Sequence, residues 1–147
     1  MEKFNSIMVV SRATEHCVNV LRYGISLART FGAEIHLLHI IHDPFNLEGW
    51  NLPAPAFNDE FQKMIDKARK ELDRIVEKEK AEGLRITEHI KYGEPADEIR
   101  NLAESENVDL ILMLGHKEGR LEHFLYGKTN DAVIRQLPAN LLLVKCG

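Results

Sequence analysis

The sequence predicts a single α/β domain, residues 1–147, in which helices cover a parallel β-sheet. Short apolar runs of strand length alternate with segments whose apolar residues recur every three or four positions, as in amphipathic helices. The run Val108–Leu114 is apolar apart from Asp109, which is typical of a strand with helices on both faces. A chain of 147 residues, 44% hydrophobic and 29% charged, fits one soluble globular domain.

The first part of the chain contains a strand, a helix and a second strand. Ile7–Val10 is a short β-branched-rich run that predicts a buried strand. A helix follows, with Thr14 as its expected N-cap and Gly32 as its stop signal. Ile35–Ile41 is the second expected strand.

A proline-rich connection and a long helix follow. The prolines of residues 43–56 argue against regular structure there, and Trp50 gives this segment an apolar load. Trp50 either packs on its own domain or covers a ligand or partner site. From Phe57 the apolar positions keep helical spacing among many charged residues until Gly83.

In the second half of the chain, expected strands and helices again follow one another. Leu84–Lys91 alternates apolar and polar residues, apart from Glu88, which predicts an edge strand with one wet face. Pro95 marks the start of a helix. Val108–Leu114 is the next strand, Asp131–Gln136 a helix segment and Leu141–Val144 the last strand. Strict β-α alternation implies a parallel sheet, whose ligands bind at the carboxyl ends of its strands.

Composition narrows the function classes. A net charge of −4 gives no long-range attraction for nucleic acids, and no apolar stretch is long enough for membrane insertion. Cys17 and Cys146 lack metal or redox spacing, which fits a cytoplasmic protein. No spacing supports a catalytic triad or a pair of catalytic carboxylates, so we expect no enzyme.

Five blocks along the chain match one known family in order and spacing: Ile7–Val10, Gly32–Ile40, Gly93–Ile99, Val108–Met113 and Gly127–Lys145. With these blocks the chain resembles the universal stress protein family along nearly its whole length. The resemblance implies a flavodoxin-like (adenine nucleotide alpha hydrolase-like) five-stranded parallel sheet of order 3-2-1-4-5 with helices on both faces. It also implies a homodimer through the last strand, formed by Leu141, Leu142, Leu143 and Val144.

Part of that family binds ATP through a loop with the pattern G-x-x-G-(nine residues)-G-S/T. Aligned without gaps, its positions fall on Leu114, Lys117, Gly127 and Lys128, so one glycine of the pattern is kept. Gly115 can replace a lost glycine only with altered loop spacing.

Two further positions of the family's ATP site can be compared. The family's aspartate after the first strand aligns with Arg12, which replaces a hydrogen-bond acceptor with a cation. Ile40 keeps the position of the adenine-side backbone contact.

The segment Gly127–Thr129 also suggests an anion site in its own right. It is not a P-loop, because position 122 is Glu122 where that motif needs glycine. It begins an expected helix, whose free N–H groups favour an anion. The predicted pocket for ATP or another adenine nucleotide is lined by Arg12, Ile40, Gly115, His116, Lys117, Gly127, Lys128 and Thr129. The alternative is that these cations are solvated loop charges.

Three histidines, His36, His39 and His42, are spaced by three. On a strand this spacing sends His39 to the face opposite the other two, so the three cannot share a metal ion. A site with His116 lacks a third ligand, and we expect no metal. The leading hypothesis is therefore a stress-response binding and signalling module. The alternative is a nucleotide-free dimer that acts through contact with a protein partner.

Overall fold

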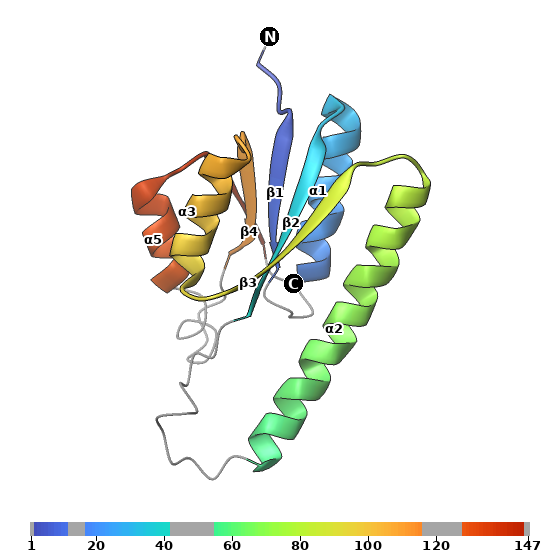
Figure 1. Ribbon diagram of the computed structural model, residues 1–147, viewed down its shortest axis with the longest axis vertical. Coiled ribbons are helices and arrows are strands. Elements are labelled where there is room, and N and C mark those ends of the chain that lie inside the picture. Colours follow the sequence, from blue (N-terminus) through green and yellow to red (C-terminus); the bar gives the residue numbers. More distant parts are fainter. Residues whose placement is uncertain (1, 12–16, 42–54, 116–127, 146–147) are drawn as a thin grey trace.

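The computed structural model describes residues 2–11, 17–41, 55–115 and 128–145, and these form a five-stranded parallel sheet with helices on both faces (Figure 1). The strands are β1 (Ser6–Ser11), β2 (Glu34–Ile41), β3 (Ile86–Tyr92), β4 (Leu110–Leu114) and β5 (Asn140–Val144). Their order is β3-β2-β1-β4-β5, and every neighbouring pair is parallel. The predicted fold class and strand order are confirmed.

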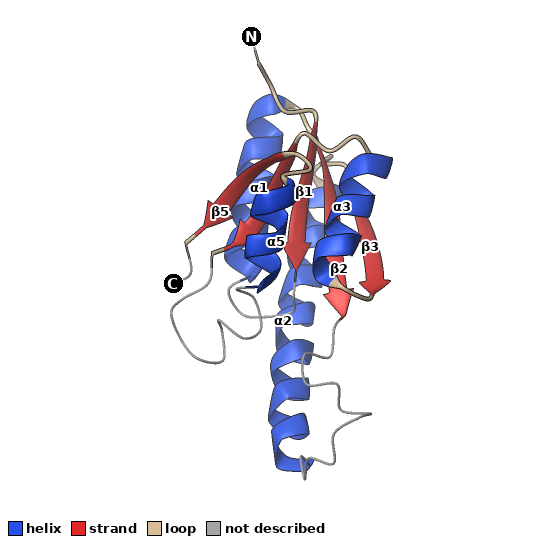
Figure 2. Ribbon diagram, turned by 90° about the vertical axis from the view of Figure 1, so that its left-hand side faces the viewer, coloured by secondary structure: helices blue, strands red, loops and turns tan. Residues whose placement is uncertain are grey.

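Four described helices cover the sheet: α1 (Cys17–Phe31), α2 (Pro55–Ala81), α3 (Pro95–Ser105) and α5 (Lys128–Gln136). Figures 1 and 2 show α1 and α2 on one face and α3 and α5 on the other. Thr14, the expected N-cap of α1, lies outside the described residues. The prediction that the prolines keep residues up to Ala56 out of regular structure is wrong at its end, because α2 already begins at Pro55. Proline suits the first turn of a helix, where its missing N–H has no partner to lose.

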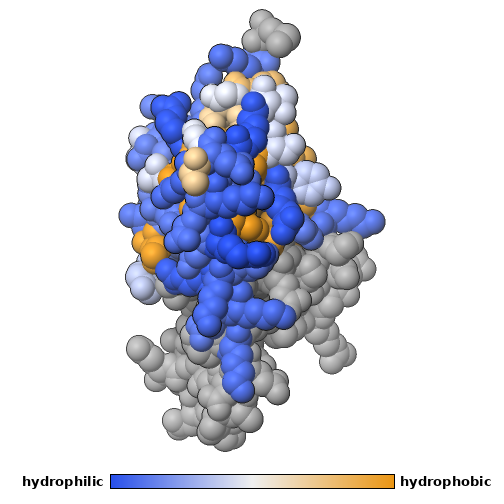
Figure 3. All heavy atoms as spheres, turned by 90° about the vertical axis from the view of Figure 1, so that its right-hand side faces the viewer, coloured by the Kyte–Doolittle hydropathy of each residue, from blue (hydrophilic) through white to orange (hydrophobic). Residues whose placement is uncertain are grey.

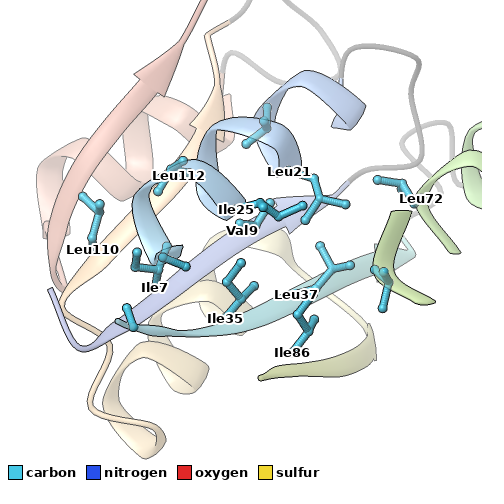
Figure 4. Packing of buried hydrophobic residues seen from close by; sticks show 14 of the residues in the cluster. Ile7, Val9, Leu21, Ile25, Ile35, Leu37, Leu72, Ile86, Leu110 and Leu112 are labelled. Atoms are coloured by element: carbon cyan, nitrogen blue, oxygen red, sulfur yellow. The ribbon is translucent and has the colours of Figure 1, made fainter. Parts of the chain in front are cut away.

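Each face of the sheet buries its own apolar core. On the α1–α2 face, side chains from all five strands contribute to the core beneath the two helices, as Figure 4 shows for Val9, Leu37 and Leu112. On the α3–α5 face, Met8, Leu38 and other alternate strand residues pack against the second pair of helices. Successive residues of β1 and β2 thus enter opposite cores, which explains the continuous apolar run Ile7–Val10 in β1 and the apolar pairs Leu37–Leu38 and Ile40–Ile41 in β2.

Gly24 lets α1 lie close against the sheet. A Cβ atom at this position would come within 2.5 Å of Cγ2 of Val9 and 3.8 Å of Cδ2 of Leu112. The first distance is shorter than van der Waals contact allows, and the β-branched Val9 is fully buried. Helix α1 ends at Gly32, whose φ of +68° is the left-handed conformation predicted for its stop signal.

Ion pairs join α1 to α2 on the solvent side. Arg29 binds the carboxylates of Glu79 and Glu82, and Arg22 lies 3.8 Å from Glu71. Figure 3 shows that the described residues on this side of the molecule are mostly hydrophilic. Because most of these groups are at least partly exposed, the pairs contribute little to stability. Among the described residues, no helix combines the length and apolar character that crossing a membrane requires.

Asp109 organises the amino-terminal end of the sheet. Its Oδ2 accepts hydrogen bonds from the backbone N–H groups of Asn5 (2.7 Å) and Ser6 (3.0 Å). Its carbonyl oxygen accepts from the backbone N–H and the side-chain Nδ2 of Asn140. One polar residue in an otherwise apolar run thus joins the starts of β1, β4 and β5.

Strand β3 is the edge strand that the alternating sequence predicts, but its side chains are distributed differently. Ile86 is buried, whereas Ile90 is 45% exposed, although the pattern places both on the apolar face. Figure 1 shows the reason: β3 diverges from α2 toward its carboxyl end. Glu88, which breaks the pattern, lies 3.2 Å from Nε2 of His39 on the neighbouring strand.

Candidate functional site

The carboxyl ends of β1, β2 and β4 meet at one end of the sheet, as the parallel arrows of Figure 2 show. Strand β1 is central, and β2 and β3 are added on one side of it and β4 and β5 on the other. The order in which strands are added to the sheet therefore reverses between β1 and β4, although the two strands are parallel. In open α/β sheets ligands bind at the carboxyl ends of strands beside such a reversal.

Helix α5 is held at this end of the sheet by Asn130. The Nδ2 of Asn130 donates a hydrogen bond to the carbonyl oxygen of Leu114, across 3.0 Å, and the residue is almost fully buried. Leu114 is the last residue of β4, so the bond fixes the first turn of α5 beside the end of the strand. The first N–H groups of α5 have no partner within the helix and carry its positive dipole end. This arrangement can attract an anion.

Gly115 follows β4 at the same end. Its N–H donates to the carbonyl oxygen of Val144 across 2.8 Å, which continues the β4–β5 pairing by one residue. A Cβ atom here would lie 3.4 Å from the same oxygen, so the glycine lets the chain leave β4 close against β5. The predicted site residue Gly115 thus lies at the end of β4, one residue beyond the carbonyl that binds Asn130.

Ile40 also lies at this end of the sheet. Strand β2 continues by Ile40 and Ile41 past Ser11–His39, the last β1–β2 pair. The Ile40 side chain is buried in the core under α3, so the backbone is what this residue can offer a ligand. The expected backbone contact of Ile40 with a ligand stays a prediction.

The structure describes part of the predicted pocket. Ile40 and Gly115 are placed as above, and Lys128 and Thr129 form the first turn of α5, although their side chains lie outside the described part. Arg12, His116, Lys117, Gly127 and the loop residue Trp50 also lie outside the described residues. The structure thus describes the backbone of four of the eight predicted pocket residues, and the pocket itself stays a prediction.

Asn130 is the site residue that the sequence did not reveal. Its role depends on the distance between a helix start and a strand end 16 residues earlier, and no motif spacing encodes that distance. The one available signal was its type, because asparagine is unfavourable inside helices and favourable in their first turn.

His36 and His39 lie on opposite faces of β2, as predicted, and contact different partners on β3. Among the residues that the structure describes, no three His, Cys, Asp or Glu side chains are placed to hold a metal ion.

Comparison with known proteins gives one consistent family. The model of the universal stress protein family matches residues 3–145. Universal stress protein MJ0531 of Methanocaldococcus jannaschii is 26% identical, and the match covers 97% of this chain and 82% of that protein. Universal stress protein MJ0577 of the same organism is 30% identical over 76% of each chain.

Solved structures give the same fold. The structure of MJ0577 covers 99% of both chains at 24% identity with a TM-score of 0.70. A universal stress protein crystallised with cAMP has a TM-score of 0.63 at 17% identity and covers 97% of this chain and 98% of its own. A family protein of Arabidopsis thaliana with AMP bound has a TM-score of 0.62 at 18% identity, with 97% and 92% covered.

Proposed function

This chain belongs to the universal stress protein family, and we propose that it is a non-enzymatic binding and signalling module of the cytoplasm that holds an adenine nucleotide or another small anion. The proposed site is the end of the sheet formed by β1, β2 and β4. The cytoplasmic location rests on the cysteine usage alone, and cell fractionation tests it.

The hydrogen bond between Asn130 and Leu114 is the observation that carries this proposal. It holds the amino-terminal turn of α5 beside the ends of β4 and β1, where a ligand of this fold is expected. In our proposal the phosphate or other anion lies at this turn, and the base lies near the backbone of Ile40. Structures of related proteins with cAMP and AMP support the choice of an adenine nucleotide.

The departures from the family's glycine pattern indicate how the ligand is held. Leu114 and Lys117 replace glycines, so fewer backbone N–H groups can approach a phosphate closely. Three cations stand at positions of the family's ATP site: Arg12 at the aspartate, Lys117 at the second glycine and Lys128 at the Ser/Thr position. We infer that this protein binds its anion more through cationic side chains than through a glycine-rich loop.

A thermal-shift series with ATP, ADP, AMP and cyclic AMP, each with and without magnesium, tests the proposal. A ligand at a hundred times its dissociation constant stabilises the folded state by roughly 2.7 kcal/mol. We expect at least one nucleotide to raise the melting temperature, and Lys128→Ala to lose most of that shift. Lys80→Ala is the matched control, because this exposed lysine ends α2 at the opposite end of the sheet.

Two results contradict the proposed nucleotide site. If no nucleotide shifts the melting temperature of the wild-type protein, the nucleotide proposal is wrong. If Lys128→Ala and Lys80→Ala reduce the shift equally, the nucleotide binds elsewhere.

A second function, dimerisation, is favoured by the surface of β5. This edge strand leaves Leu142 38% and Leu143 42% exposed, and their side chains point to opposite faces of the sheet. Exposed apolar edge strands favour pairing with another strand. We propose that two copies of the chain pair through β5, whether or not a nucleotide is bound.

A further inference from the structure

Two histidine rings meet between β2 and β3, at the end of the sheet opposite the proposed nucleotide site. His36 lies near the start of β2 and is 5% exposed, and its Nδ1 lies 3.0 Å from Nε2 of His89 on β3. On the other side of the His36 ring, Nε2 lies 3.1 Å from Oε1 of Glu34. The three side chains form one hydrogen-bonded row.

The rings meet nitrogen to nitrogen rather than stacked. Their centroids lie 5.2 Å apart with an interplanar angle of 34°, which fits two rings joined through facing nitrogen atoms. Because Glu34 accepts a hydrogen bond from Nε2 of His36, the neutral ring of His36 carries its proton there and presents a lone pair at Nδ1. His89 then donates its Nε2–H to that lone pair.

The space between the two facing nitrogens holds one proton. One added proton leaves the contact intact, because the singly charged pair still has a donor on one ring and an acceptor on the other. A second added proton puts an N–H group on both facing nitrogens and two positive charges on adjacent rings. The hydrogen bond is then lost and the rings repel each other.

Burial and nearby charged groups shift the pKa of His89 in both directions. Burial and the neighbouring His36 lower the pKa of His89, in that order, while Glu106 at the end of α3 raises it and Lys91 on β3 lowers it. On the other ring, His36 contacts the carboxylate of Glu34. The folded protein therefore takes up the second proton less readily than two free histidines do.

Few buried side chains hold strand β3 on the sheet, so the contact between His36 and His89 matters for its attachment. It has a single neighbour in the sheet, and Ile86 is its one buried residue. Most of its other side chains are exposed, including Tyr92 at 72%. His89 is the partly buried residue that anchors the middle of the strand on the α3 face.

We propose that the His36–His89 pair is a proton-operated latch, which holds the edge strand β3 on β2 while the pair carries at most one added proton and releases it when a second binds. The direction in pH follows from linkage. The unfolded chain binds the second proton more readily, so the stability that the latch contributes is present above the ordinary histidine pKa of about 6.5 and is lost as the pH falls below it. Acid therefore loosens β3 before the centre of the sheet.

Amide hydrogen exchange tests the latch. We expect the protection factors of β3 amides to fall about tenfold more than those of β1 between about pH 7.5 and about pH 5.5. His89→Gln removes the titrating ring, and its β3 protection should then follow β1. His39→Gln is the matched control, because His39 joins the same two strands on the opposite face, to Glu88, and it should behave as the wild type does.

A second measurement uses the wild-type protein alone, so it does not require a variant that folds. Ring nitrogen NMR of the wild-type protein should show His89 titrating below the ordinary histidine pKa. Titration of His89 at or above that ordinary value overturns the proposal. Equal loss of β3 protection in the wild type and in His89→Gln overturns it as well.

Discussion

The Nδ2 of Asn130 lies 3.0 Å from the carbonyl oxygen of Leu114, and this hydrogen bond joins the first turn of α5 to the last residue of β4. The two residues come from elements that are separated by residues 115–127. The bond therefore joins the start of the helix directly to the end of the strand.

Asn130→Ala should destabilise the protein and weaken ligand binding together. Removal of the side chain leaves the Leu114 carbonyl without this buried donor, a loss of about 1–3 kcal/mol in the free energy of unfolding. Urea unfolding measures the stability, and the nucleotide-induced thermal shift should shrink in the same variant. Asn101→Ala, an exposed position on α3, is the matched control and should change neither quantity by much. Equal effects in the two variants would falsify the role assigned to Asn130.

Gly24→Ala should destabilise the protein even though alanine favours helices by roughly 1 kcal/mol over glycine. The new Cβ would lie 2.5 Å from Cγ2 of Val9, so α1 has to move away from the sheet. Overpacking of this kind costs about 1–3 kcal/mol, which exceeds the gain in helix propensity. Chemical denaturation measures the net effect, with Ser26→Ala on the exposed side of α1 as control. A stabilised Gly24→Ala variant would show that the helix adjusts without cost.

Asp109→Ala should destabilise the amino-terminal end of the sheet. The change removes the acceptor for the N–H groups of Asn5 and Ser6, and charge-assisted hydrogen bonds of this type contribute roughly 1.5–3 kcal/mol. Denaturant unfolding gives the total loss, and hydrogen exchange should show it first at the start of β1. Asp73→Ala on the exposed side of α2 controls for the loss of one negative charge. If both variants lose the same stability, the hydrogen bonds from Asn5 and Ser6 to Asp109 are not the cause of the loss.

Leu142→Lys and Leu143→Lys should each shift the protein toward the monomer. A lysine on an edge strand brings charge against the paired copy and opposes strand addition. Light scattering coupled to size exclusion gives the mass at several concentrations. Ile90→Lys is the matched control, because it places the same charge on an exposed residue of the other edge strand. A wild-type protein that runs as a monomer at all concentrations contradicts the proposed dimer.

The sequence predicted the elements that apolar pattern and proline or glycine signals define. The continuous runs of β1 and β4 and the start of α3 at Pro95 were predicted, because burial on both faces leaves a direct trace in composition. The partners of polar residues were not, because they depend on the register between strands. Glu88 breaks the alternation of β3, and its partner is His39 on β2. The alternation places His89 on the solvent-exposed face, whereas in the structure its ring contacts His36.

The same limit applies to the candidate site. Ile40 and Gly115 could be placed from the sequence, since a strand end and a following glycine are local features. Asn130 could not, because its function is a distance between two elements.

The central position of β1 also determines the order in which the fold can form. Its Ile7 pairs with Ile35 on one side and with Leu110 on the other, so one edge of β1 is completed early in the chain and the other only after β4 exists. At roughly 5–20 residues per second, a ribosome needs several seconds to proceed from β2 to β4. We expect the apolar edge of β1 to remain open for that time, which pulse proteolysis of nascent chains can check. The pairing of β1 with β4 at the centre of the sheet thus follows the β1–β2 and β2–β3 pairings, and until then the open edge of β1 leaves the young chain exposed to misassembly.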